Sequence, residues 1–374
     1  MSRETAEADR SLMARAIALA ERGRGRVSPN PLVGALVVAD GEVVGEGAHE
    51  AFGGPHAEVA ALQAAGARAK GATLYVSLEP CAHRGKTPPC TEAILAAGVG
   101  RVVFAVRDPC AEARGGAETL ERAGVSVTGG ILATEAARGN AAFLWRHGTG
   151  RPFVTLKLAV SIDGRIAAAE GVRTRLTGPD AEAETMRLRA EHDAVLVGGG
   201  TARVDDPRLT VRPPALARRA PVRVVLDSRA RLAPTSRLVE SSGKAPVLLM
   251  TAPDADGERL SRLEAAGVEI EQVRRDPAGG LDLDLALARL AGRGLGAILC
   301  EGGAELAGRL VEGGHVQRLV LLVAPTTLGP AGVPSLGRRG GGDEWRLAAC
   351  RPLGTDAFVQ WDARELDAWL LGGG

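Results

Sequence analysis

Apolar residues in the first part of the chain recur at two spacings. Residues 34–47 (GALVVADGEVVGEG) hold two apolar runs around an Asp-Gly pair, which predicts a β-hairpin. Residues 56–66 (HAEVAALQAAG) have helical spacing and end at a glycine. Further strands are expected at residues 72–80 and 101–109, and helices within residues 1–25 and at residues 91–100, where Thr91 is the expected N-cap. Residues 116–130 are expected to form a helix followed by a strand. This order predicts a mostly parallel, helix-covered sheet with the hairpin at one edge.

The pattern is interrupted at residues 143–153 (FLWRHGTGRPF), where two glycines and a proline break it. Strands are then expected at 153–167, where the strand runs into a turn, and at 193–200, 222–228, 246–251, 296–303 and 318–325, with a helix at 181–192. We therefore expect two α/β domains, residues 1–149 and residues 150–374. Residues 336–345 are expected to form a flexible loop and residues 371–374 a frayed tail.

Length, composition and charge argue against several classes of protein. A chain of 374 residues with 45% hydrophobic positions can form two cores. A net charge of +1 and 3% aromatic residues argue against a nucleic-acid-binding surface. No apolar run is long enough to span a membrane, and the N-terminal residues mix acids with bases, unlike a signal peptide. Five cysteines, an odd number, favour a reducing compartment. We expect a cytoplasmic protein without nucleic-acid or membrane partners.

Three residues in the first half have the spacing of metal ligands. His56 opens a predicted helix, Cys81 follows a strand that ends in Glu-Pro, and Cys90 precedes the next helix. One histidine and two thiolates can hold one zinc ion per chain with an open position for water. Zinc would supply hydroxide at neutral pH, and Glu58 would pass its proton to a departing amine. The residue types match those of zinc-dependent deaminases, which predicts hydrolytic deamination of a heterocycle.

Other interpretations of these residues compete with this one. A lone His-x-Glu is a weak signal, and two cysteines nine positions apart are more often unrelated buried thiols. If His83 were a fourth ligand, the zinc would be structural and closed. Eight residues separate Cys81 from Cys90, where the general deaminase signature has two, and the insert AHRGKTPP is basic and rich in turn residues. That insert favours an anionic substrate over a closed zinc site.

The segments SPNPLVGALVV, HEAFGGPHAEVAAL and SLEPCAHRGKTPPC resemble those of the bifunctional riboflavin biosynthesis deaminase-reductase family. The second half adds the similar segments LKLAVSIDGRIA, DDPRLTVR and EGGAEL, so the resemblance spans almost the whole chain. It implies an N-terminal cytidine-deaminase-like three-layer α/β/α domain and a C-terminal dihydrofolate-reductase-like α/β domain. The family deaminates 2,5-diamino-6-(5-phosphoribosylamino)pyrimidin-4-one and then reduces the ribosyl group to ribityl with NADPH.

The resemblance also implies roles for residues of the first domain. The positions matching His56, Cys81 and Cys90 hold zinc in the family, and the position matching Glu58 shuttles protons. The substrate is contacted at positions matching Asn30, His49, Lys86 and Asp108, with Lys86 suited to the ribose phosphate. Asn30 could equally be a turn residue between prolines. Cys110 replaces an asparagine of the family's Asp-Pro-Asn-Pro turn, which puts one substrate contact in doubt.

In the second domain, no Gly-x-Gly-x-x-Gly follows a strand, so a Rossmann site is unsupported. The glycines after Glu301 suit a phosphate at a strand-to-helix turn, although such pairs are more often plain turns. The resemblance implies substrate contacts at Lys157, Arg189, Leu209, Arg212 and Glu301, with both arginines suited to a phosphate. It implies NADPH contacts at Ala159, Ile166, Arg175, Thr201, Asp205, Ser228, Gly303, Ala304, Glu305, Leu306, Ala307, Gly308 and Arg309.

Arg173 and Arg175 occupy places where the family often has serine and tryptophan, so altered cofactor contacts are expected. We also expect Asp163 and Gly164 to shape the turn after the first strand of this domain. A homodimer is expected, because the reductase-like fold commonly pairs.

One alternative is a nucleoside or tRNA deaminase fused to an unrelated α/β domain; the long cysteine insert and the matching second half oppose it. A zinc-stabilised binding protein would have no need of Glu58.

Overall fold

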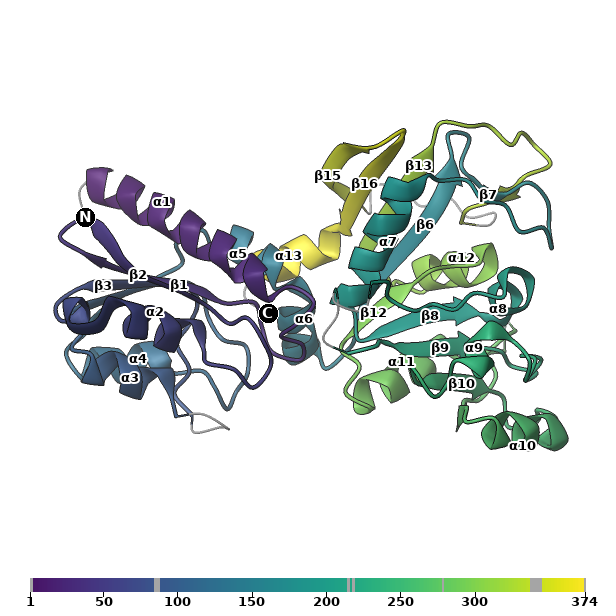
Figure 1. Ribbon diagram of the computed structural model, residues 1–374, viewed down its shortest axis with the longest axis horizontal. Helices are drawn as coiled ribbons and strands as arrows, with labels where there is room; N and C mark the ends of the chain where they lie inside the picture. The colour runs from purple at the N-terminus through teal and green to yellow at the C-terminus, as the bar shows by residue number, and fades with distance from the viewer. Residues whose placement is uncertain are drawn as a thin grey trace. The chain divides into compact units, whose positions relative to one another are not determined.

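The computed structural model describes residues 3–83, 88–213, 216, 219–277, 279–336 and 345–372 (Figure 1). The chain divides into two compact units. The first comprises Met1–Gly150 together with the end of the chain from Trp369, and the second comprises Arg151–Ala368. Within the described residues, no helix is both long and apolar enough to cross a membrane.

The first unit is built on a five-stranded sheet in the order β2-β1-β3-β4-β5. Strands β1 and β2 form the predicted hairpin at its edge, and its turn places Asp40 and Gly41 at φ 52° and 79°. Strand β1 is antiparallel to β3, whereas β3, β4 and β5 run parallel. The bounds are β1 Gly34–Ala39, β2 Glu42–Ala48, β3 Thr73–Leu78, β4 Arg101–Val106 and β5 Ser126–Gly129.

Helices cover both faces of this sheet, which gives three layers. Side chains of β1, β3 and β4 alternate between two cores. One core packs against α1 (Arg3–Ala20) and α5 (Ala133–Gly139). The other packs against α2 (Ala57–Ala65), α3 (Cys90–Ala96) and α4 (Gly116–Arg122). Two short 3₁₀ turns, Glu21–Gly23 and Gly66–Ala69, follow α1 and α2.

Two local predictions for this unit are wrong. Thr91 lies inside α3, which begins one residue earlier and has Pro89 as its N-cap. A proline presets the backbone for a helix start, so the helix begins directly after it. Residues 143–149 are not a break but belong to α6 (Ala141–Thr149). The helix ends at Gly150, whose φ of 70° is favourable for glycine.

The second unit contains a nine-stranded sheet in the order β11-β10-β9-β8-β12-β6-β13-β16-β15. Strands from β11 to β13 in this order run parallel, and β16 and β15 are antiparallel to their neighbours. Its strands are β6 Phe153–Ser161, β8 Ala194–Gly198, β9 Val222–Leu226, β10 Val247–Thr251, β11 Glu269–Gln272, β12 Ala297–Cys300, β13 Arg318–Ala324, β15 Trp345–Leu353 and β16 Asp356–Ala363. A separate two-stranded sheet pairs β7 (Arg165–Ala167) with β14 (Val333–Pro334).

Helices again pack on both faces of the large sheet. Leucines of α11 and α12 fill one core, and side chains of α8, α9 and α10 contribute to the other. Helix α7 packs over β12, β13 and β16. The bounds are α7 Pro179–Glu191, α8 Gly199–Asp205, α9 Arg237–Glu240, α10 Gly257–Ala265, α11 Leu283–Gly292, α12 Ala304–Glu312 and α13 Arg364–Gly372.

The expected strands of the second unit are present, and so is the turn after β6. Asp163 accepts hydrogen bonds from Ser161 Oγ and from the amides of Leu328 and Gly329, and Gly164 has φ 75°. Residues 337–344 of the predicted loop, and residues 373–374 of the predicted tail, lie outside the described residues. The tail prediction is wrong for residues 371–372, because α13 continues through them.

Candidate metal centre and a second polar site

Three side chains of the first unit converge: His56, Cys81 and Cys90. Their ligand atoms all lie within 4.8 Å of one another. His56 Nδ1 is 3.1 Å from Cys90 Sγ and 3.7 Å from Cys81 Sγ. Ligands of a tetrahedral zinc site, with bonds of about 2.0 Å to nitrogen and about 2.3 Å to sulfur, lie about 3.5–3.8 Å apart. The donor set and its spacing fit zinc.

Local structure positions each of these ligands. His56 is the N-cap of α2, with extended backbone at φ −70° and ψ 156°. Cys81 follows the end of β3, and Cys90 is the first residue of α3. The Cys90 amide donates to Cys81 Sγ at 3.3 Å, as amides at a helix start do to a thiolate. Within the described part of the chain, no fourth donor joins the cluster, His83 included, which leaves a coordination position open.

The charges of the cluster are consistent with a cation site. Hydrogen bonds from Cys90 and from His56 lower the pKa of the Cys81 thiol to about 4 despite its burial. The hydrogen bond with Cys81 in turn raises the pKa of His56, although burial of the ring opposes this. The lowered pKa of Cys81 favours its thiolate, the form in which cysteine binds zinc.

Glu58 lies in the first turn of α2, beside this cluster. Its side chain is buried, with 4% of the residue exposed. Burial raises the pKa of Glu58, while its own backbone amide and His56 act in the opposite direction. A carboxyl group in this position can accept a proton and release it again, as a general acid-base catalyst must.

A cavity of about 470 Å³ opens onto the cluster and is lined by His56, Glu58 and Cys81. Asn30 and His49 also line it, and Asn30 Nδ2 lies 3.0 Å from His49 Nε2. His49 Nδ1 lies 2.9 Å from the Pro55 carbonyl, and burial lowers the pKa of His49. The structure therefore places these two predicted substrate contacts in the cavity that holds the metal cluster.

Asp108 and Cys110 form a turn on the wall of the same cavity. Asp108 Oδ1 accepts a hydrogen bond from the Cys110 amide at 2.9 Å, and burial raises the pKa of Asp108 to about 6. The Cys110 thiol donates to Glu112 at 3.4 Å. Lys86, the predicted phosphate contact, lies outside the described residues.

Sequence reasoning missed Glu79, which organises this wall. Its carboxylate accepts hydrogen bonds from the amides of Asp108, Gly115 and Ala117, each at 3.1 Å. With 2% exposed, Glu79 joins the end of β3 to the turn after β4 and to the start of α4. Its position in the Glu-Pro pair before Cys81 was the only available signal. Phe143, Arg146 and His147 of α6 were missed as well, although all three line the cavity.

In the second unit, Arg189 and Glu301 form a two-pronged ion pair. Arg189 Nη2 lies 2.9 Å from Glu301 Oε2, and Arg189 Nε donates to the other oxygen. Both side chains are only 10% exposed. The third guanidinium nitrogen donates to the Thr210 carbonyl at 3.0 Å. Although burial opposes it, Arg189 keeps the pKa of Glu301 below its usual value, so the carboxylate is ionised.

Lys157 belongs to the same charged group. Burial lowers the pKa of Lys157, and Glu301 acts in the opposite direction. The lysine projects from the middle of β6, whose neighbour β12 ends one residue before Glu301. Three of the predicted substrate contacts thus form one buried electrostatic group.

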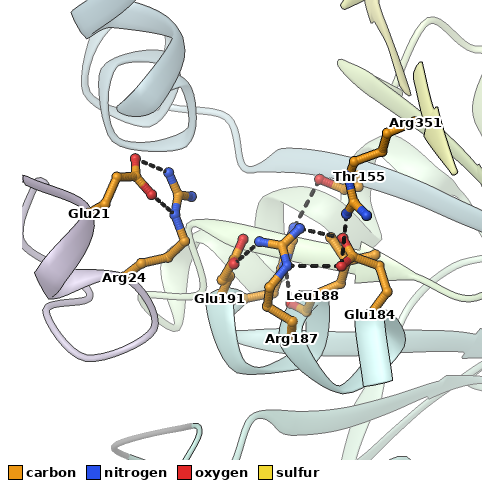
Figure 2. A network of polar contacts seen from close by, with 9 residues as sticks. Glu21, Arg24, Thr155, Glu184, Arg187, Leu188, Glu191 and Arg351 are labelled. Carbon is orange, nitrogen blue, oxygen red and sulfur yellow. Dashed lines mark hydrogen bonds and ion pairs between the residues drawn. The ribbon is translucent and has the colours of Figure 1, made fainter. Parts of the chain in front are cut away.

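The helix that carries Arg189 is anchored independently of this pair. Figure 2 shows Glu184 of α7 between Arg187 of the same helix and Arg351 of β15. The Arg351–Glu184 contact measures 3.0 Å, and the Arg351 guanidinium also lies 4.4 Å from the centre of the Phe358 ring. These contacts hold α7 against the antiparallel end of the sheet.

The turn between β12 and α12 leaves no space for side chains larger than glycine at Gly302 and Gly303. Gly302 and Gly303 have φ 88° and 51°, and a Cβ on Gly303 would come within 2.9 Å of Thr201 Oγ1. Backbone amides at the start of α12 point out of such a turn and favour an anion. The predicted cofactor contacts Thr201, Gly303, Ala304 and Glu305 lie at this turn.

Other predicted contacts lie further from this turn or are already engaged. Leu306 and Ala307 are in the core, Gly308 packs against Leu336, and Arg309 binds Asp276 and the Leu281 carbonyl. Leu209 is also a core residue, so only its backbone can meet a ligand. Arg175 and Arg212 both pair with Glu182. Ala159 lies on β6, Ile166 on β7, Asp205 at the end of α8 and Ser228 after β9.

Two family models match the chain. Residues 6–106 match the cytidine and deoxycytidylate deaminase zinc-binding region, and residues 152–359 match the RibD C-terminal domain. The expected fold classes, a cytidine-deaminase-like domain followed by a reductase domain of the dihydrofolate-reductase-like kind, are confirmed.

Whole-length relatives agree with these matches. The riboflavin biosynthesis protein RibD of Escherichia coli is 38% identical over 94% of this chain and 98% of the relative, and that of Bacillus amyloliquefaciens is 41% identical over 86% and 85%. The solved structure of Acinetobacter baumannii RibD superposes with a TM-score of 0.86 at 35% identity, covering 96% of this chain and 99% of that one. A Thermotoga maritima diaminohydroxyphosphoribosylaminopyrimidine deaminase/5-amino-6-(5-phosphoribosylamino)uracil reductase, at 31% identity, has a TM-score of 0.82 over 96% and 99%.

Proposed function

The chain belongs to the RibD family of riboflavin biosynthesis proteins, and on that premise we propose that its two domains act in succession on one phosphorylated pyrimidine. It is a deaminase and a reductase. We assign the deamination of 2,5-diamino-6-(5-phosphoribosylamino)pyrimidin-4-one to residues 1–149. We assign the reduction of the ribosyl group to ribityl to residues 150–374.

The observation that carries the deaminase assignment is the His56–Cys81–Cys90 cluster with buried Glu58 at one cavity. When bound, zinc lowers the pKa of a water molecule. Glu58 removes a proton from that water and delivers it to the leaving amine, so that ammonia departs and a carbonyl replaces the amino group. Asn30 and His49, 3.0 Å apart, orient the pyrimidine, and Asp108 contacts it from the opposite turn.

The reductase assignment is supported by the buried group of Lys157, Arg189 and Glu301 and by the glycine turn before α12. NADPH, when bound, supplies a hydride to C1′ of the ring-opened sugar. Glu301 and Lys157 position that sugar, and Arg212 meets the substrate phosphate. Thr201 and the amides of Gly303 and Ala304 hold the cofactor phosphates. Asp205 orders the sugar from the end of α8.

Separate assays of the two half-reactions test this assignment. Purified protein should release ammonia from the diamino substrate without any nicotinamide cofactor. It should oxidise NADPH, and NADH more slowly, when given the deaminated substrate. If ammonia is released from the diamino substrate but NADPH is not oxidised with the deaminated substrate, the second domain is not a reductase. If NADPH is oxidised with the deaminated substrate but the diamino substrate releases no ammonia, the deaminase assignment is refuted.

We propose two further properties, a cytoplasmic location and a homodimer. We place the enzyme in the cytoplasm, because its five cysteines are free thiols. A homodimer is supported by the edge strand β15, on which Leu347 is 55% exposed. Light scattering on the purified chain measures its mass in solution, and the homodimer predicts the mass of two copies, not of one.

A further inference from the structure

One side of α6 forms part of the wall of the deaminase cavity. Phe143, Arg146 and His147 are spaced by three and four residues, so they share one face of the helix, and all three line the cavity. The opposite side of α6 is buried, with Leu144 at 4% and Trp145 at 5% exposure. The helix thus buries one side and presents Phe143, Arg146 and His147 at the cavity.

The buried side of α6 is held by the end of the chain, which belongs to the same unit. The rings of Trp145 and Trp369 lie 5.7 Å apart in an edge-to-face arrangement. A Cβ on Gly148 would come within 2.2 Å of the Trp369 ring, so the indole fits closely over that glycine. These contacts fix the rotation of α6 and keep the side chain of Arg146 on the cavity side.

The guanidinium of Arg146 is available to a ligand. Within the described ranges of the chain, no carboxylate or other acceptor engages it, and the residue is half-buried. Three carboxylates line the cavity: Glu79 is held by three amides, Asp108 accepts from the Cys110 amide, and Glu58 lies beside the metal cluster. Glu112 acts electrostatically on the neighbouring His147. A half-buried cation without a partner is stabilised when an anion binds next to it.

We propose that Arg146 binds the phosphate of the pyrimidine substrate while the pyrimidine is held at the metal cluster; this inference rests on the proposed deaminase function. Guanidinium groups match phosphate with two parallel hydrogen bonds. His147, whose ring lies 4.5 Å from that of Phe143, offers another hydrogen-bond donor on the same helix face. The cavity, at about 470 Å³, has the size of sites that enclose a small ligand of this kind. Arg146 therefore selects the phosphorylated pyrimidine over the unphosphorylated nucleoside.

The test compares ammonia release from the phosphorylated substrate with ammonia release from its dephosphorylated nucleoside. In R146Q, the KM for the phosphorylated substrate should rise about 10- to 100-fold, the effect of losing a hydrogen bond between charged groups. The kcat should change little, because the phosphate takes no part in the chemistry. The kinetics with the nucleoside should be unchanged. R146M keeps the aliphatic stem and should behave as R146Q does, whereas R146K should recover part of the loss.

R107Q is the matched control, since Arg107 is an exposed arginine of the same unit that pairs with Glu118 and does not line the cavity. It should leave both substrates unaffected. Equal losses with both substrates in R146Q and R146M, or no loss with either, would overturn the role of Arg146. If the unmodified enzyme released ammonia from neither substrate, the deaminase function itself would be refuted, so the two failures are distinguishable.

Discussion

Replacing Glu58 by glutamine is expected to lower the kcat of ammonia release by about 10²- to 10⁴-fold, the usual contribution of a general acid-base group. Glutamine keeps the shape of the side chain but can neither accept a proton from water nor deliver one to the amine. Because Glu58 is not among the three clustered ligand residues, zinc should remain at one ion per chain. Reduction of the deaminated substrate should be unchanged. Ammonia release, zinc content and NADPH oxidation measured on the same preparation check all three points.

The matched control is Glu92→Gln, on an exposed carboxylate of α3 two residues after Cys90. This variant should keep normal ammonia release. Full deaminase activity in Glu58→Gln with zinc retained would show that another group moves the proton. A loss of zinc in Glu58→Gln, absent from the control, would instead mean that Glu58 supports the metal, and the proton-transfer role would be withdrawn.

Replacing Glu301 by glutamine is expected to damage both the stability and the chemistry of the second domain. Arg189 would keep its positive charge in a site where it is only 10% exposed. Removing one partner of a buried ion pair typically costs about 3–5 kcal/mol, because the other charge stays buried and uncompensated. The pKa of Lys157 should also fall further, because the Glu301 charge no longer opposes the effect of burial. Urea unfolding should report the lower free energy, and NADPH oxidation should fall sharply.

Glu264→Gln serves as the control for this variant, because Glu264 is an exposed carboxylate of α10 in the same unit. It should change neither the free energy of unfolding nor reduction. Ammonia release should survive in Glu301→Gln at temperatures where the protein stays folded. An unfolding free energy and an NADPH oxidation rate both equal to those of the unmodified chain would remove Glu301 and Arg189 from the proposed reductase site.

The predictable parts of the fold and the site are those that depend on neighbours in the sequence. The Asp40-Gly41 pair marks a hairpin because both residues adopt positive φ in its turn. His56 and Glu58 share the first turn of one helix, so their proximity follows from a two-residue spacing. Cys81 and Cys90 could be assigned to the same metal site because each adjoins the end of a strand or the start of a helix, where side chains meet at one edge of a sheet.

Contacts between distant segments were not predictable in the same way. Arg189 and Glu301 were each expected near the substrate, but 112 residues separate them, and nothing local indicates that they pair with each other. Glu79 looks like an ordinary strand end until three amides from the turn after β4 and the start of α4 converge on it. The hairpin of β15 and β16 was missed because much of β15 is exposed, which removes the apolar alternation that signals a strand.

The central claim is that one chain carries out both steps, deamination first and reduction second. The most direct test is to give the purified protein the diamino substrate and NADPH together and to follow ammonia and NADP⁺ in the same reaction. The account predicts one NADP⁺ for each ammonia released, with NADPH oxidation lagging behind ammonia. NADPH oxidation that starts without a lag and exceeds the ammonia released would contradict the order of the two steps, and ammonia release without any NADPH oxidation would contradict the claim that both occur on this chain.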